Sequence, residues 1–209
     1  MRLSTTAFAD GAPIPAEFAF GAIDAATHVK LSANRNPDFA WSVLPAGTQS
    51  LALVCHDPDV PSRGDDVNKE GRHVPASLPR VEFFHWIMVD IPLECRELGA
   101  GSCSEGVVAH GKQNPFGPPG AKQGINDYTG WFANDASMGG DYYGYDGPCP
   151  PWNDALLHHY HFKVYALDVA SLPLVRGFSL AELRAAMVGH VLAEAELVGV
   201  YSLNPAVTG

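Results

Sequence analysis

The sequence predicts one mainly β domain with long irregular loops and a single amphipathic helix near its C-terminus. The 21 glycines and 17 prolines among 209 residues interrupt regular structure often. Apolar residues recur with the period of two typical of strands in residues 81–91 and 158–167, and with helical spacing in residues 179–195. The length lies near the upper limit for one domain and no repeat or linker interrupts it, so we assign residues 1–209 to one domain.

Composition and charge limit the class of protein and of partner. With 46% hydrophobic and 17% charged residues, the chain is not largely disordered, and no apolar run approaches the roughly 18 residues of a membrane span. Thirteen basic against 23 acidic residues leave a formal net charge of −10, which repels nucleic-acid backbones and anionic membranes. We therefore expect no nucleic-acid partner and no stable membrane insertion, whereas a small anion can still bind where local donors outweigh the overall field.

The N-terminus and the cysteines indicate a cytoplasmic protein. The first residues, Met1 to Asp10, contain no apolar segment of the kind found in secretory signals. Four cysteines are scattered along the chain without a Cys-x-x-Cys pair: Cys55, Cys95, Cys103 and Cys149. Without a signal, we expect these cysteines to be reduced.

A first strand is predicted at residues 50–56, which are rich in apolar side chains. Pro58 withholds a ladder donor and restricts the residue before it, so this strand is expected to stop at Asp57. The Asp57–Pro58 bond is also a candidate for the cis form. Residues 62–80 are polar and broken by prolines, which indicates a long loop of the kind that is often functional or mobile.

Residues 81–91 carry the strongest strand pattern in the chain. Both faces of an ideal strand here would hold large apolar groups, which is typical of a central strand in a layered structure. One predicted face consists of Val81, Phe83, His85, Ile87, Val89 and Ile91, and the other of Glu82, Phe84, Trp86, Met88 and Asp90. His85 is the single polar residue on its face, and alone it would more often be a hydrogen-bonded core histidine than a site residue.

The C-terminal half begins with an irregular stretch and ends in regular elements. Residues 99–151 show too little periodicity for helices or strands, and so long a stretch in one domain suggests a function. A strand is predicted at residues 158–167. Ser179 and Glu182 then fit a capping box at the start of a helix over about residues 179–195, and residues 197–203 are expected to form a last strand.

Common catalytic motifs are absent from the sequence. It contains no Gly-x-Ser-x-Gly elbow, no Gly-x-x-x-x-Gly-Lys-Ser/Thr phosphate loop, no Gly-x-Gly-x-x-Gly and no His-Glu-x-x-His. His159 and His161 could supply two metal ligands from one strand face, but no third ligand is evident there. We therefore expect no metal and no cofactor.

Two ordered sets of residues resemble the signatures of the phosphatidylethanolamine-binding protein family. Residues 57–61 (Asp-Pro-Asp-Val-Pro) followed by 84–86 (Phe-His-Trp) resemble the first signature. Residues 147–151 (Gly-Pro-Cys-Pro-Pro) followed by 158–162 (His-His-Tyr-His-Phe) resemble the second. The C-terminal stretch from Leu183 is similar to the bacterial branch, whose members are described as Raf kinase inhibitor-like.

The resemblance implies a fold, a ligand class and a set of site residues. The family fold is a two-sheet antiparallel β-sandwich with peripheral helices, and its small pocket binds phosphate-like and carboxylate anions, including phospholipid head groups. By resemblance, the ligand-binding residues are Asp57 and His85 from the first signature, His158 and Tyr160 from the second, Cys149 and Pro150 at the wall, and Phe83 at the mouth. Imidazole and phenol groups can donate hydrogen bonds to anion oxygens, whereas Asp57 would accept one from an imidazole.

Three functions are weighed on these residues. The leading one is a non-catalytic protein that binds a small anion, with a kinase-regulatory role implied by the family branch but no kinase-binding surface evident. The second is a hydrolase-type enzyme that uses Asp57 with the two site histidines, for which an imidazolium would have to activate Cys149. The third is an interaction protein with a vestigial pocket that forms a homodimer through the aromatic residues of 128–143. This insert and the long 62–80 loop differ from the pattern of the family that the sequence resembles. Either segment could reshape or cover the mouth of the pocket.

Overall fold

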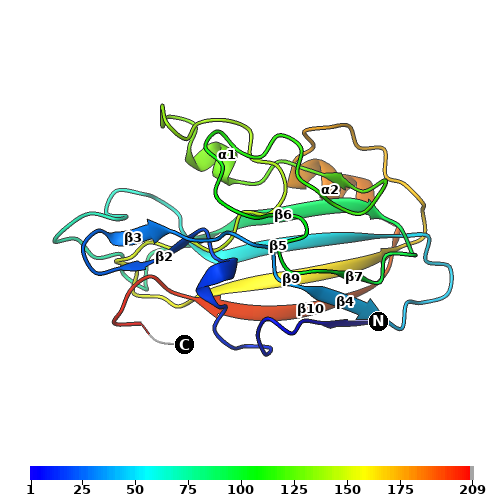
Figure 1. The fold of residues 1–209 in the computed structure, drawn as a ribbon, viewed down its shortest axis with the longest axis horizontal. Helices are drawn as coiled ribbons and strands as arrows, with labels where there is room; N and C mark the ends of the chain where they lie inside the picture. The colour runs from blue at the N-terminus through cyan, green and yellow to red at the C-terminus, as the bar shows by residue number, and fades with distance from the viewer. Residues whose placement is uncertain (208–209) are drawn as a thin grey trace.

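The computed structural model describes residues 1–207, which form two main β-sheets packed face to face (Figure 1). A five-stranded sheet has the order β10-β9-β5-β6-β8, a three-stranded sheet has the order β1-β4-β7, and β2 pairs with β3 in a small hairpin. All these pairs are antiparallel. The strands are β1 (Arg2–Ser4), β2 (Gly21–Asp24), β3 (His28–Leu31), β4 (Phe39–Ser42), β5 (Ser50–Pro61), β6 (Arg80–Ile91), β7 (Glu97–Leu98), β8 (Lys122–Gln123), β9 (His158–Leu167) and β10 (Val191–Tyr201).

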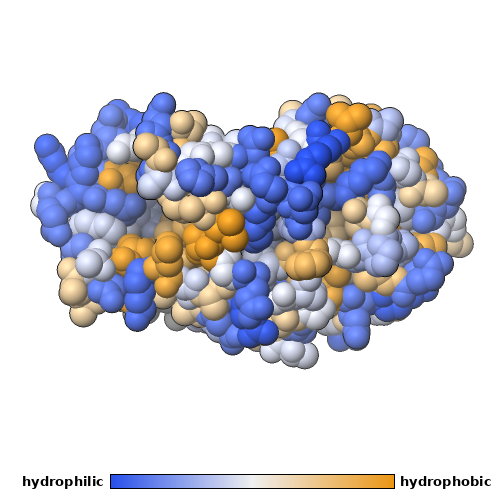
Figure 2. All heavy atoms as spheres, turned by 45° about the horizontal axis from the view of Figure 1, so that its top comes forward, coloured by the Kyte–Doolittle hydropathy of each residue, from blue (hydrophilic) through white to orange (hydrophobic). Residues whose placement is uncertain are grey.

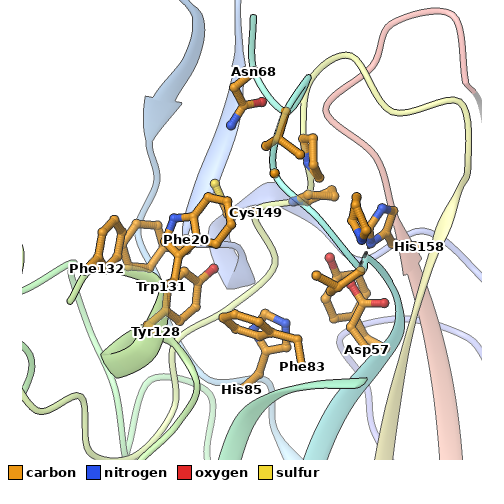
Figure 3. A pocket seen from close by; sticks show the side chains of 17 residues that line it. Phe20, Asp57, Asn68, Phe83, His85, Tyr128, Trp131, Phe132, Cys149 and His158 are labelled. Atoms are coloured by element: carbon orange, nitrogen blue, oxygen red, sulfur yellow. Dashed lines mark hydrogen bonds and ion pairs between the residues drawn. The ribbon is translucent and has the colours of Figure 1, made fainter. Parts of the chain in front are cut away.

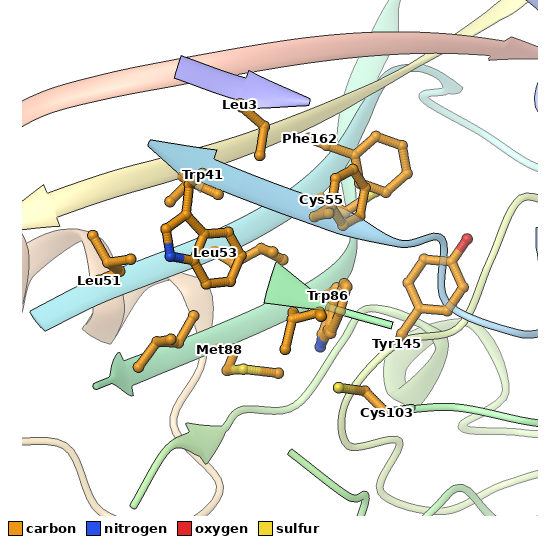
Figure 4. Packing of buried hydrophobic residues seen from close by; sticks show 14 of the residues in the cluster. Leu3, Trp41, Leu51, Leu53, Cys55, Trp86, Met88, Cys103, Tyr145 and Phe162 are labelled. Carbon is orange, nitrogen blue, oxygen red and sulfur yellow. The ribbon is translucent and has the colours of Figure 1, made fainter. Parts of the chain in front are cut away.

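The main hydrophobic core lies between the two sheets, as expected for a β-sandwich. Leu3 and Trp41 of the small sheet pack toward large side chains of the five-stranded sheet, including Leu53, Trp86 and Phe162 (Figure 4). Trp86 and Phe162 are fully buried. The predicted sandwich is therefore confirmed, and the apolar faces of the sheets are what hold it together.

The outer face of the five-stranded sheet is covered by helix α2 (Leu180–Met187) and the loop that leads into it (Figure 1). Leu183 and Met187 of the helix join Val54 and Ile87 of the sheet in a second buried cluster. β6 is thus covered on both faces, which confirms its prediction as a central strand. The remaining helices are short: η1 (Ala16–Phe18) and α1 (Tyr128–Trp131).

Helix α2 begins where the sequence predicts and ends earlier. The Ser179 hydroxyl accepts a hydrogen bond from the Glu182 N–H while the Glu182 carboxylate accepts from the Ser179 N–H, so the predicted capping box is present. The helix stops at Met187, and Gly189 follows with a φ of +81°. Residues 191–195 belong to β10, so the prediction of a helix to residue 195 is wrong because pairing with β9 outweighs the helical pattern.

β5 continues past Asp57, where the sequence predicts its end. Asp57 pairs with Phe83, but the next pair joins Val60 to Val81, which leaves the residues between in a β-bulge. Pro58 lies in this bulge, where its missing N–H removes no ladder hydrogen bond. No cis peptide bond occurs in residues 1–207, so the candidate cis bond at Asp57–Pro58 is trans.

A second β-bulge turns His85 toward the interior of the sandwich. Cys55 pairs with Trp86 and His56 with Phe84, so the register skips His85. After this bulge Ile87 and Val89 face helix α2, whereas Trp86 and Met88 face the main core. The predicted strict alternation is therefore wrong beyond His85, which shares no face with Ile87 and Val89.

The irregular segment 99–151 is held to the sandwich by a buried carboxylate. Asp146 is fully buried and receives hydrogen bonds from Asn34 Nδ2 at 2.8 Å and Asn126 Nδ2 at 2.9 Å. Lys112 Nζ lies 2.5 Å from the same carboxylate. Burial raises the pKa of Asp146, and the Lys112 cation and the two amides act against that rise. Asp146 thus ties three separate parts of the chain to one point.

One face of the molecule is seen in the space-filling view. The face in Figure 2 is largely hydrophilic, with hydrophobic residues in small separate groups. Within residues 1–207, no helix has both the length and the apolar character needed to cross a membrane. All four cysteines are free.

Gly124, just after β8, is expected to tolerate no side chain. A Cβ there would lie 2.5 Å from Ile87 Cδ1 and 2.5 Å from the Phe178 carbonyl oxygen, which belongs to the backbone and cannot move aside. Gly124→Ala should lower the free energy of unfolding in urea by about 2–3 kcal/mol through overpacking. Gly130→Ala is the matched control, because a Cβ at Gly130 in α1 meets nothing within 4 Å. Equal unfolding midpoints for the two variants would contradict this packing.

Candidate functional site

One small cavity, of about 100 Å³, lies where the ends of β5, β6 and β9 meet α1 and two loops (Figure 3). It is lined by every residue that the sequence analysis assigns to the pocket: Asp57 of β5, Phe83 and His85 of β6, His158 and Tyr160 of β9, and Cys149 and Pro150 of the preceding loop. The two bulges in β5 and β6 bring Asp57 and His85 to its floor. The structure therefore gathers residues that lie up to about a hundred positions apart.

An aromatic wall closes one side of the cavity, and sequence reasoning did not assign it. Tyr128, Trp131 and Phe132 come from α1 and the turn after it, and Phe20 comes from the segment before β2 (Figure 3). The Phe20 and Tyr128 rings stack with centroids 4.6 Å apart. The Tyr128 hydroxyl donates to the Gly147 carbonyl oxygen at 2.8 Å and is unavailable to a ligand. The aromatic insert at 128–143 was the available signal for this wall, whereas nothing in the sequence marks Phe20.

His158 is held between two carboxylates and has no exposed surface. Its Nδ1 lies 2.7 Å from Asp57 Oδ2 and its Nε2 lies 3.1 Å from Asp154 Oδ2. Burial by itself lowers the pKa of His158, but the two carboxylates outweigh it and raise that pKa to about 9. Both ring nitrogens then carry protons that are donated to carboxylates. The predicted contact between Asp57 and an imidazole is present, and it leaves no N–H of His158 for a ligand.

Asp154 extends this interaction to Arg80. The Arg80 guanidinium contacts both carboxylate oxygens of Asp154, at 2.5 and 3.0 Å. Burial favours the neutral acid, yet the hydrogen bonds from His158 and Arg80 prevail and lower the pKa of Asp154 to about 2. The sequence analysis missed Asp154, which lies four residues before His158 in the turn that leads into β9.

The long loop predicted at residues 62–80 forms a roof over the cavity. Gly64, Val67 and Asn68 of this loop line it, and Asn68 is at the top of the view in Figure 3. The buried side chain of Asn153 fastens the loop, because its Oδ1 accepts from the Asn68 N–H at 3.0 Å and its Nδ2 donates to the Asp66 carbonyl at 2.9 Å. The loop therefore covers the mouth of the cavity instead of lying apart from it.

His85 presents a single free nitrogen at the cavity. The residue is 3% exposed, and its Nδ1 donates to the Asp146 carbonyl oxygen at 2.8 Å. Its Nε2 forms no hydrogen bond with any residue from 1 to 207. Burial lowers the pKa of His85 to about 4, against a smaller opposite effect of the Asp57 charge. At neutral pH the ring is uncharged, so Nε2 carries a lone pair and accepts hydrogen bonds.

Cys149 and Tyr160, which line the cavity together with His85, remain protonated at neutral pH. Burial raises the pKa of the Cys149 thiol to about 12, so the thiolate that nucleophilic catalysis requires is not formed at neutral pH. Burial and then the charge of Asp57 raise the pKa of Tyr160 well above its ordinary value. The Tyr160 hydroxyl thus keeps its proton beside Asp57 at the cavity.

The His-x-His pair lies away from the cavity, on the other face of β9. His159 Nδ1 lies 2.8 Å from Asp59 and His161 Nδ1 lies 2.7 Å from Glu196. Each of the two histidines thus forms a hydrogen bond with a different carboxylate.

Comparison with known proteins gives one consistent result. A family model described as phosphatidylethanolamine-binding protein matches residues 4–202. A UPF0098 protein of Methanothermobacter thermautotrophicus is 33% identical over 96% of this chain and 98% of its own length. The crystal structure of Escherichia coli YbcL, described as a member of the mammalian PEBP family, has a TM-score of 0.69 at 25% identity and covers 96% of this chain and 97% of its own. That of the PEBP homologue CT736 of Chlamydia trachomatis has a TM-score of 0.64 at 28% identity, over 96% of each chain.

His158 should make the stability of the fold depend on pH. Because its folded pKa is raised to about 9 from 6.5, its stabilising contribution is complete below the unfolded pKa and is lost as pH rises toward 9. The free energy of unfolding should therefore fall by roughly 2 kcal/mol between pH 6.5 and 8.5. Urea unfolding curves at several pH values measure this.

His158→Gln is expected to be less stable throughout and to lack this dependence. His159→Gln is the matched control, because His159 is exposed on the opposite face of the strand and its variant should keep the wild-type slope. Parallel pH curves for wild type and His158→Gln would show that His158 is not the titrating group.

Proposed function

The chain belongs to the phosphatidylethanolamine-binding protein family, and from this premise and its cavity we propose a non-catalytic binding protein. Its ligand is a small molecule that carries a phosphate or carboxylate group, such as a phospholipid head group or a phosphorylated side chain. The anionic group lies on the floor against His85 and Tyr160, and the rest of the ligand lies against the aromatic wall.

The observation that carries this proposal is the contrast between floor and wall. The floor gathers buried polar groups, among which the Nε2 of His85 has no partner among residues 1–207, while Phe20, Trp131 and Phe132 form an apolar side. An apolar cavity with a few convergent polar groups is the usual form of a small-molecule site. The amide of Asn68 adds a polar group at the roof.

The enzyme alternative lacks an activated nucleophile. Cys149 is the candidate from the sequence, and burial holds its pKa at about 12. The imidazolium that would have to activate it, His158, gives both N–H groups to Asp57 and Asp154. The charged ring of His158 thus donates its hydrogen bonds to the two carboxylates and has none left to stabilise a thiolate.

The dimerisation alternative takes the aromatic insert at 128–143 as the contact surface. In the structure Tyr142 and Tyr143 are buried, and Phe132 packs in the cavity wall. Trp131 is 51% exposed but also lines the cavity. Phe132 and Trp131 thus help to build the proposed ligand site, and the two tyrosines are not free for a partner, which favours binding over self-association as the role of the insert.

The test is calorimetric titration of inorganic phosphate, phosphoethanolamine and acetate into wild type and two histidine variants. We expect His85→Ala to weaken binding at least tenfold, because it removes the free nitrogen on the floor, and His161→Ala to bind as wild type does. His161 lies on the opposite face of the same sheet and is the matched control. Equal affinities for wild type and His85→Ala would place the binding site elsewhere, and no binding of any of the three to wild type would contradict the function.

A further inference from the structure

The charges around the cavity already balance one another. Asp57 contacts His158, His158 contacts Asp154, and Asp154 contacts Arg80, so two carboxylates and two cations form one continuous chain. Every charge in this chain is compensated by a neighbour. An anion entering the cavity would therefore lie beside Asp57 with no unpaired positive charge to receive it, and such burial is costly without a partner.

The geometry of His85 decides how it can meet an anion. Its Nδ1 must carry the proton, because the atom that it contacts is the carbonyl oxygen of Asp146, which only accepts. The carboxylate of the same residue is anchored by Lys112 and two asparagines, so this carbonyl is firmly placed. The uncharged ring then directs a lone pair from Nε2, which repels an anion oxygen, whereas the protonated ring donates to it.

The other titratable groups around His85 are occupied or already protonated. From β5, Asp57 uses Oδ2 for His158 and Oδ1 for the N–H of Asp59. From β9, His158 is fully engaged and Tyr160 keeps its proton. The list is completed by Tyr128 of α1 and Cys149 of the preceding loop, whose pKa values are both raised. His85 is the group left to gain a proton when an anion arrives.

We propose that the cavity binds each anion together with one proton, which is taken up at Nε2 of His85. This deepens the proposed function and rests on it. A phosphate monoester in its monoanionic form supplies the proton itself, since the P–O–H bond gives up its hydrogen to Nε2 and the complex holds a dianion against an imidazolium. A carboxylic acid does the same. Sulfate carries no such proton, so its complex must take one from solvent.

The ligand that best suits neutral pH is therefore an oxygen acid whose last proton leaves near that pH, such as a phosphate monoester. A carboxylate is already ionised there and, like sulfate, must take its proton from solvent. Sulfate affinity should fall about tenfold for each pH unit above pH 5, because one proton is bound with each ion. A phosphate monoester, whose second pKa lies at about 6, should bind with nearly constant affinity up to that pH and lose about tenfold per unit above it. Burial keeps the pKa of unliganded His85 at about 4, which makes the uptake close to one full proton at pH 7.

Calorimetry in buffers of different ionisation enthalpy tests this directly. Sulfate is titrated into wild type, His85→Gln and His161→Gln at pH 6 and 7, and the buffer dependence of the heat gives the protons taken up per ion. We expect wild type and His161→Gln to take up nearly one proton for each sulfate bound, and the residual binding of His85→Gln to take up almost no proton. Binding by wild type without proton uptake, or unchanged uptake in His85→Gln, would overturn the inference.

A second measurement covers the case in which His85→Gln binds too weakly to titrate. In wild type labelled with ¹⁵N histidine, saturation with sulfate at pH 6 should move the Nε2 resonance of His85 from the lone-pair range to the protonated range. An unchanged resonance in the bound protein would overturn the inference. The proposed function stands if anions bind without a proton, and it fails, together with this inference, if wild type binds neither sulfate nor phosphoethanolamine at pH 5.

Discussion

The burial of one carboxylate, that of Asp146, is the constraint on which the rest of the site depends. A buried charge is stable only when it is paired and hydrogen-bonded. The partners of Asp146 are Lys112 and Asn126 from its own irregular segment and Asn34 from the distant loop after β3. Its backbone carbonyl then accepts from His85. The interaction that orders the irregular half of the chain therefore also sets which nitrogen of the floor histidine faces the cavity.

A second set of charges connects the floor of the cavity to its roof. His158 joins Asp57 on the floor to Asp154, and Arg80 joins Asp154 to the base of the 62–80 loop through the carbonyls of Pro75 and Leu78. A buried ion pair of this kind adds little net stability to the fold. Removing one partner is nevertheless strongly destabilising, because the other charge is then buried without a partner. The floor and the loop therefore share one network, while the aromatic wall, held by stacking on Phe20, forms a separate part of the cavity.

Much of the fold could be predicted from the sequence because its strongest signals are local. The strand at 81–91, the strand at 158–167 and the Ser179–Glu182 capping box all appear in the structure. The errors occur where pairing between distant strands prevails: residues 191–195 join β10 despite their helical spacing, and β5 passes Pro58 through a bulge. Local pattern cannot reveal a bulge, because it depends on the register with a partner strand.

For the candidate site, the sequence by itself determined which residues meet, since every side chain named from the two signatures lines the cavity. Tertiary structure alone decided what those groups can do. It placed His158 between Asp57 and Asp154, which leaves that ring charged and fully engaged, and it placed His85 against the Asp146 carbonyl, which leaves one free nitrogen. The sequence gives the type of each residue, but its protonation and its free hydrogen-bonding atoms depend on burial and on neighbours such as Asp57 and Asp146, which lie 101 and 61 positions from their histidines.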